Sequence, residues 1–202
     1  MKKMALALAA ALMTLSMSTA FAATPSKTTT DVTQVKEVAT VNEDGTTTAA
    51  KDWNLEVAED SDEVTSEIAK IYAHVVTAGN HAVSYFPTET QEALAELFGA
   101  DFDLKTLNLN EFVTLKLTGY ENIGGDAKVT FTFTTKYEVG KKVAVVVGLY
   151  NGQRDANGQY IVEWVVLGAE ALENGDLCVV FPADVLAQIN DAVAVSMAVL
   201  SE

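Results

Sequence analysis

The second half of the chain alternates between apolar and polar positions, as strands do when one face is buried. Valine, leucine and phenylalanine at every second position interleave with threonine and lysine. Residues 142–150 are apolar on both faces, which is typical of a central strand. Residues 173–176, Glu-Asn-Gly-Asp, are a hairpin-turn signal. Strands are predicted over residues 113–118, 129–134, 142–150, 160–172, 177–181 and 193–200.

The stretch before these strands has the period of amphipathic helices. A helix is predicted over 62–79, and Asp60 with Glu63 forms a capping box at its start. A second helix is predicted over 88–98, where an apolar stripe ends at a glycine. Near the C-terminus, residues 182–189 indicate a short helical turn.

The segment before the first helix has two interpretations. Residues 32–57 are rich in valine and threonine and contain the turn signal Asp44-Gly45, so they form either a loose hairpin or a disordered spacer. Six later strands joined by short turns favour an antiparallel sandwich or a curled sheet, and helices that precede it make the class α+β. The expected division is 1–22 signal peptide, 23–58 polar leader or loose hairpin, 59–109 helical segment packed on the β domain, and 110–202 β-sandwich.

The N-terminus has the three parts of a cleaved secretory signal. Met1-Lys2-Lys3 is basic, an apolar stretch follows, and Ala20 and Ala22 provide the small residues that a signal peptidase accepts. The apolar stretch is shorter than the about 20 residues that a membrane-spanning helix needs. We therefore expect an exported protein, secreted or associated with the cell envelope, that does not stay inserted in the membrane after cleavage.

The composition restricts the partners. Residues 1–22 hold two lysines and no acids, so the mature chain has 28 acidic and 11 basic residues, a net charge of −17. Nucleic acids and anionic lipids are bound by basic surfaces, so neither is expected as a partner. An extracellular protein or a glycan is expected instead, and the protein is predicted to be a monomer or a weak dimer formed through sheet edges.

No catalytic, cofactor-binding or metal-binding motif stands out. Cys178 lies in an apolar run and is interpreted as a core residue, because a reactive thiol needs an electropositive, open setting. His74 and His81 are seven residues apart and could share a helix face as metal ligands, but a polar helix face is the favoured interpretation. We expect a non-catalytic protein without a cofactor.

The segment 150–160 contains the candidate ligand-binding residues. Tyr150 and Tyr160 flank a polar loop and could form a platform that stacks against a sugar. Asp155 and Asn157 match part of a calcium-binding loop, but Trp164 occupies the place of the bidentate glutamate. A hairpin turn at Asn157 explains the loop better.

Three motifs carry a resemblance to a known group of proteins. They are Lys-Tyr-Glu-Val-Gly-Lys-Lys-Val at 136–143, Glu-Trp at 163–164 with Asn-Gly at 174–175, and Val-Phe-Pro-Ala-Asp-Val-Leu at 180–186. With these motifs, residues 86–202 resemble a domain of uncharacterised secreted proteins of gut Firmicutes, especially clostridia. The resemblance implies an extracellular, immunoglobulin-like β-sandwich of about six or seven strands behind the two helices, and it implies no catalytic residues.

These observations lead to a ranked set of functions. The leading hypothesis is a secreted, non-catalytic module for protein interaction or cell-surface display. The alternative is a carbohydrate-binding module that uses Tyr150 and Tyr160, and an exported hydrolase ranks below both because function depends on sites rather than folds. A structural spacer in the cell wall is also compatible with the sequence.

Overall fold

The structure, a computed structural model, describes residues 34–58, 67–71, 82–158 and 160–202. The predicted signal peptide lies outside the described residues, and so does the capping pair Asp60 and Glu63. Of the helix predicted over 62–79, residues 67–71 are described and are helical. The helix predicted over 88–98 is confirmed as α2 (Thr88–Phe98).

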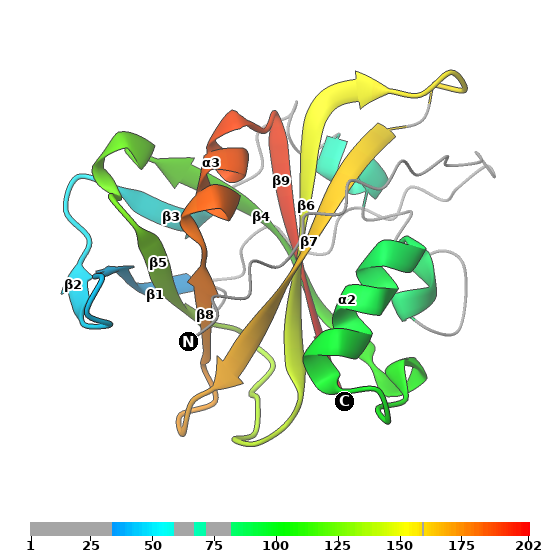
Figure 1. The fold of residues 1–202 in the computed structure, drawn as a ribbon, viewed down its shortest axis with the longest axis horizontal. Coiled ribbons are helices and arrows are strands. Elements are labelled where there is room, and N and C mark those ends of the chain that lie inside the picture. Colours follow the sequence, from blue (N-terminus) through cyan, green and yellow to red (C-terminus); the bar gives the residue numbers. More distant parts are fainter. Residues whose placement is uncertain (1–33, 59–66, 72–81, 159) are drawn as a thin grey trace.

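β-strands are the main secondary structure of the described chain (Figure 1). Its strands form one antiparallel sheet of nine strands in the order β2-β1-β5-β8-β7-β6-β9-β4-β3. The strands are β1 (Gln34–Val41), β2 (Thr47–Ala49), β3 (Asn54–Val57), β4 (Asn108–Thr118), β5 (Asp126–Thr132), β6 (Val143–Arg154), β7 (Tyr160–Ala171), β8 (Leu177–Phe181) and β9 (Ala194–Ser201). Three short 3-10 helices, η1 (Ala82–Tyr85), η2 (Leu104–Thr106) and η3 (Tyr120–Asn122), and the helix α3 (Ala183–Asp191) complete the described elements.

The expected class, an α+β protein with two N-terminal helices and an immunoglobulin-like sandwich, is wrong. Residues 34–57 contribute three strands, and β1 and β2 form the hairpin that turns at Asp44-Gly45. β1 then pairs with β5, and β3 pairs with β4. The helices therefore interrupt a sheet instead of preceding one. A single continuous sheet also takes the place of the two stacked sheets that define a sandwich.

The sheet is strongly curled, so that it encloses its own core. β1 and β3 lie near opposite ends of the strand order, yet they are in contact. The inner face carries large side chains that are fully buried, among them Phe131 and Phe181. The helix α3 packs against β4, β5 and β6 and adds Leu186 and Ile189 to this core. Curling thus lets one sheet bury one face without a second sheet.

Part of the outer face is also buried. α2, residues 67–71 and η1 contribute side chains to a second core on the outer side of β6, β7 and β9. Trp164 is 6 % exposed and its ring meets that of Phe86 edge-on, with 5.1 Å between the ring centroids. The central strands are therefore buried on both faces, which explains why residues 143–150 are apolar throughout.

Candidate interaction surface

The helices cover only half of the outer face. α2 lies over β7, and the strands on the other side of β7, namely β8, β5, β1 and β2, have no helix over their outer face in the described part of the chain (Figure 1). The boundary lies at Gly168 on β7, where a Cβ would be 3.2 Å from Cδ1 of Leu97 on α2. The uncovered half of the outer face thus begins at Gly168.

A groove of about 420 Å³ runs across the uncovered strands at this level. Its size is in the range of ligand-binding pockets, about 300–1,000 Å³. The residues that line it come from the β1–β2 hairpin and from the outer face of β5, β8 and β7. They are Val41, Gly45, Thr47, Lys128, Gly168, Ala169, Glu170, Cys178 and Val180.

The floor of the groove is apolar and open to solvent. Val180 points outward from β8 and is 45 % exposed, and Leu97 at the β7 end is 41 % exposed. Both are among the four large hydrophobic residues that are exposed in the described part of the chain. Gly168 lines the groove beside Val180, and Leu97 of α2 covers the position where its Cβ would be, so the hollow opens on the Val180 side of Gly168. Apolar surface that a fold leaves open in this way marks sites of interaction.

Cys178 is the groove residue with the most reactive type of side chain, and its surroundings keep it a thiol. It is 5 % exposed, which confirms its interpretation as a buried residue. Burial raises the pKa of the Cys178 thiol; the charge of Lys128 lowers it, and the charges of Glu170 and Glu37 raise it. Nucleophilic and metal-binding cysteines act as thiolates, so this arrangement favours binding over covalent chemistry in the groove.

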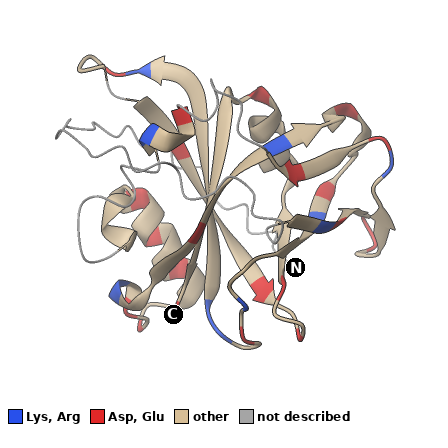
Figure 2. Cartoon of the chain, turned by 180° about the vertical axis from the view of Figure 1, so that it is seen from behind, with Lys and Arg blue, Asp and Glu red and all other residues tan. Residues whose placement is uncertain are grey.

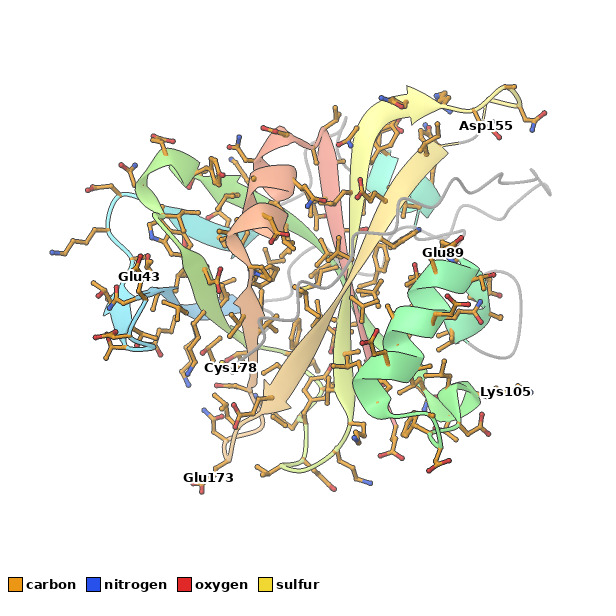
Figure 3. All side chains as sticks on the ribbon, viewed as in Figure 1. Glu43, Glu89, Lys105, Asp155, Glu173 and Cys178 are labelled. Carbon is orange, nitrogen blue, oxygen red and sulfur yellow. The ribbon has the colours of Figure 1, made fainter. Side chains whose placement is uncertain are left out.

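The four residues predicted to bind a ligand lie elsewhere, at the β6–β7 hairpin. Figure 3 shows Asp155 at the tip of this hairpin, far from Cys178. The rings of Tyr150 and Tyr160 meet edge-on with 5.0 Å between their centroids. Asp155 and Asn157 belong to the turn, where the backbone N–H of Asn157 donates to Oδ1 of Asp155 at 2.8 Å. The structure thus brings the two tyrosines together and leaves the two turn residues bonded to each other.

Both tyrosines are buried, and cationic side chains cover the ring of Tyr160. They are 5 % and 7 % exposed, and the Arg154 guanidinium lies 3.9 Å from the centre of the Tyr160 ring. Nη2 of Arg154 also donates to the Tyr160 hydroxyl at 2.5 Å, and Nζ of Lys70 lies 5.3 Å from the same ring. A sugar platform needs an exposed ring face, so these contacts give the pair a packing role.

A buried carboxylate secures the end of β8 that lies away from the groove. Asp176 accepts hydrogen bonds from Lys36 of β1 at 3.0 Å, from Thr132 of β5 at 2.9 Å and from Lys136 at 3.2 Å, and Asn174 donates to it at 2.8 Å. Burial alone would raise the pKa of Asp176, but the hydrogen bonds from Lys36, Thr132 and Lys136 outweigh it and lower the pKa to about 2. The cluster joins four parts of the chain and holds β8 in place.

Sequence reasoning missed the residues of the groove. Val180 lies in an apolar run that suggests burial on both faces, and its exposure depends on how far α2 extends over the sheet. Gly168 did carry a signal, because a glycine inside a strand often marks a close approach or a gap. Lys128 and Glu170 are charged residues in strands whose positions alternate between apolar and polar. In such strands a charged residue indicates only that its face of the strand is in contact with solvent.

The described residues hold neither a metal-binding cluster nor a membrane-spanning helix. No group of three His, Cys, Asp or Glu side chains among them could hold a metal ion. His74 and His81, which the sequence suggested as ligands, lie outside those residues. None of the described helices is long and apolar enough to cross a membrane.

Comparison of the chain with protein-family models, with curated proteins and with solved structures gave no match.

Proposed function

We propose that the protein is an exported, non-catalytic module that binds another protein through the groove on the outer face of β5, β8 and β7. The observation that carries this proposal is the open apolar floor around Val180, next to the border at Gly168 and Leu97 where helical cover of the sheet ends. A folded protein in water gains free energy by covering such surface, at about 25 cal/mol per Å² of apolar area.

The chemistry of the groove supports binding as its role. Its charged side chains are Lys128 and Glu170, which stand on opposite sides of β8, and neither has a partner suited to proton transfer among the lining residues. Its nucleophile, Cys178, is buried with a raised pKa. The N-terminal sequence supports export, because Lys2 and Lys3, the apolar stretch and Ala20 to Ala22 follow the pattern of a signal peptide.

A substitution in the groove tests the proposal. The chain from residue 23 to 202 contains every described residue and can be used as bait for proteins of the producing cell's surface and medium. Val180→Asp places a charge on the groove floor, whereas Val193→Asp makes the same change at a valine that is 61 % exposed and lies outside the groove. Circular dichroism and thermal unfolding establish that both variants fold.

The expected result is a protein that is retained by the unchanged chain and by Val193→Asp but is lost with Val180→Asp. The proposal fails if no protein is retained, or if Val180→Asp retains the same protein as well as Val193→Asp does. An identified partner is then titrated against the three baits, so that the loss is measured as an affinity.

A further inference from the structure

The charges around the groove restrict the partner. Glu170 of β7 lies opposite Cys178 of β8, and Glu37 of β1 lies in the same row across Thr130 of β5, so two carboxylates stand near the floor. Both are exposed, and Lys128 is the single base among the lining residues. α2, whose Leu97 lies over Gly168, carries three more exposed acids, Glu89, Glu92 and Glu96, and Figure 2 shows red acidic positions along this helix. The groove therefore has Glu37 on its β1 side and Glu170 on its β7 side, with Lys128 of β5 between these strands.

The rest of the molecule reinforces this local field. A mature charge of −17 repels anionic ligands and attracts cationic ones, and it speeds the encounter with a positively charged partner. A second copy of the same chain carries the same negative charge, so the field opposes self-association through this face.

The shape of the groove favours an extended chain. It is open to solvent, and several of its lining residues are small, such as Thr47, Gly45 and Gly168, so a backbone can lie close to the strands. An extended segment points alternate side chains to opposite sides, at a spacing of about 6.6 Å for every second residue. One such side chain can enter the hollow beside Gly168 and Val180 while a neighbouring side chain reaches Glu170.

We infer that the groove binds an extended cationic polypeptide segment, in which a small aliphatic side chain fills the hollow beside Gly168 and Val180 and an adjacent lysine or arginine pairs with Glu170. This inference rests on the proposed function and names the class of its partner.

Model peptides test the inference while the partner is still unidentified. Fluorescently labelled peptides of alternating valine and lysine, valine and glutamate, and serine and lysine are titrated with the protein, and binding is followed by fluorescence anisotropy. The valine–lysine peptide should bind tightest, because only it supplies both the apolar and the cationic part. Higher salt should weaken this binding, since the ion pairs are partly exposed.

Charge variants locate the contact. Glu170→Gln should weaken binding of the valine–lysine peptide about two- to fivefold, the size of a solvent-exposed ion pair. Glu121→Gln removes the same charge from η3, outside the groove, and should leave affinity within error. Glu170→Lys should shift the preference toward the valine–glutamate peptide.

Three results would overturn the inference. Equal binding of the serine–lysine peptide would reduce it to non-specific charge attraction, and equal effects of Glu170→Gln and Glu121→Gln would move the contact out of the groove. The third is a protein that binds no peptide and forms a dimer in sedimentation analysis, and that becomes a monomer when Val180 is replaced by aspartate. In that case the groove would bind a second copy of the chain, and the proposed binding of protein would still hold. Failure of the proposed function has a different result, namely a Val180→Asp variant that retains every partner of the unchanged chain.

Discussion

Cδ1 of Leu97 lies 3.2 Å from the position that a Cβ would occupy at Gly168, so the last turn of α2 rests on bare backbone of β7. A second glycine on the outer face has a different environment. At Gly148 on β6 a Cβ would lie 2.6 Å from the Trp164 ring and 2.6 Å from Oγ of Ser196. The exposed leucine can move, whereas Trp164 and Ser196 are enclosed in the outer core.

Alanine at the two glycines should therefore affect stability to different extents. Gly168→Ala should change the free energy of unfolding by no more than about 1 kcal/mol, because Leu97 can shift and the unfolded chain loses some freedom. Gly148→Ala should lower it by about 1–3 kcal/mol, the cost of overpacking a filled core. Urea unfolding followed by tryptophan fluorescence measures both, and equal effects would contradict this packing.

The Asp176 cluster should make stability depend on acid. The pKa of Asp176 is about 2 in the folded protein against 3.8 ordinarily, so the folded state favours the ionised carboxylate. Its contribution is fully present above about pH 4 and is lost as the pH falls through the range from about 4 to about 2.

Asp176→Asn should remove this acid dependence. At pH 7 the variant should lose about 1–3 kcal/mol of unfolding free energy, the value of hydrogen bonds to a charged group. Lys36 and Lys136 are more than half exposed, so water solvates them once the charge is gone. Thermal unfolding between pH 2 and pH 7 tests the prediction against Asp101→Asn, an exposed control. A parallel loss of stability with acid in the Asp176→Asn variant would show that other groups are responsible.

The sequence predicted local structure well because local structure depends on neighbouring residues. Alternation indicated β4 and β5, the turn at 173–176 indicated the β7–β8 hairpin, and the apolar stripe at 88–98 indicated α2. The pairing of β1 with β5 joins segments about ninety residues apart, and such long-range register leaves no periodic signal. The single sheet was therefore missed, although a curled sheet was one of the two forms that the strand pattern allowed.

The groove was missed for a related reason. Whether Val180 is covered depends on where α2 ends over the sheet, which is a property of tertiary packing. Conversely, Tyr150 and Tyr160 have polar neighbours in sequence, but Arg154 and Lys70 cover the Tyr160 ring in the folded chain. Burial of an aromatic side chain at a strand end thus depends on residues whose position in the fold cannot be predicted from the neighbouring sequence.

The Tyr160 hydroxyl and ring should contribute separately to stability. Tyr160→Phe removes the hydrogen bond from Arg154 and keeps the ring under the guanidinium, so it should cost about 0.5–1.5 kcal/mol. Tyr160→Ala removes a buried aromatic side chain and should cost about 3–5 kcal/mol. Chemical unfolding measures both, and a similar small cost for the two variants would place the ring at the surface. For any sugar-binding assay Tyr160→Phe is consequently the better variant, because Tyr160→Ala confuses lost binding with lost folding.

The thiol of Cys178 should react slowly while the protein is folded. It is 5 % exposed and burial raises its pKa, so both access and the thiolate fraction are reduced. At pH 8 a thiol reagent such as Ellman's should label the folded protein at least about tenfold more slowly than the protein in concentrated urea. Labelling at the same rate in both conditions would show that β8 opens readily and that the groove floor is mobile.

Export should leave a defined N-terminus. If signal peptidase cleaves after Ala22, the protein recovered outside the cytoplasm begins at Ala23, and its mass lacks residues 1–22. Ala20→Phe places a large side chain in a subsite that accepts small residues, so uncleaved precursor should accumulate in the membrane fraction. Ser18→Phe changes a residue outside those two subsites to the same side chain and should still be processed. N-terminal sequencing and intact mass measure each case, and a protein that keeps Met1 and stays in the cytoplasm would refute export, which would also remove extracellular proteins from the possible partners of the groove.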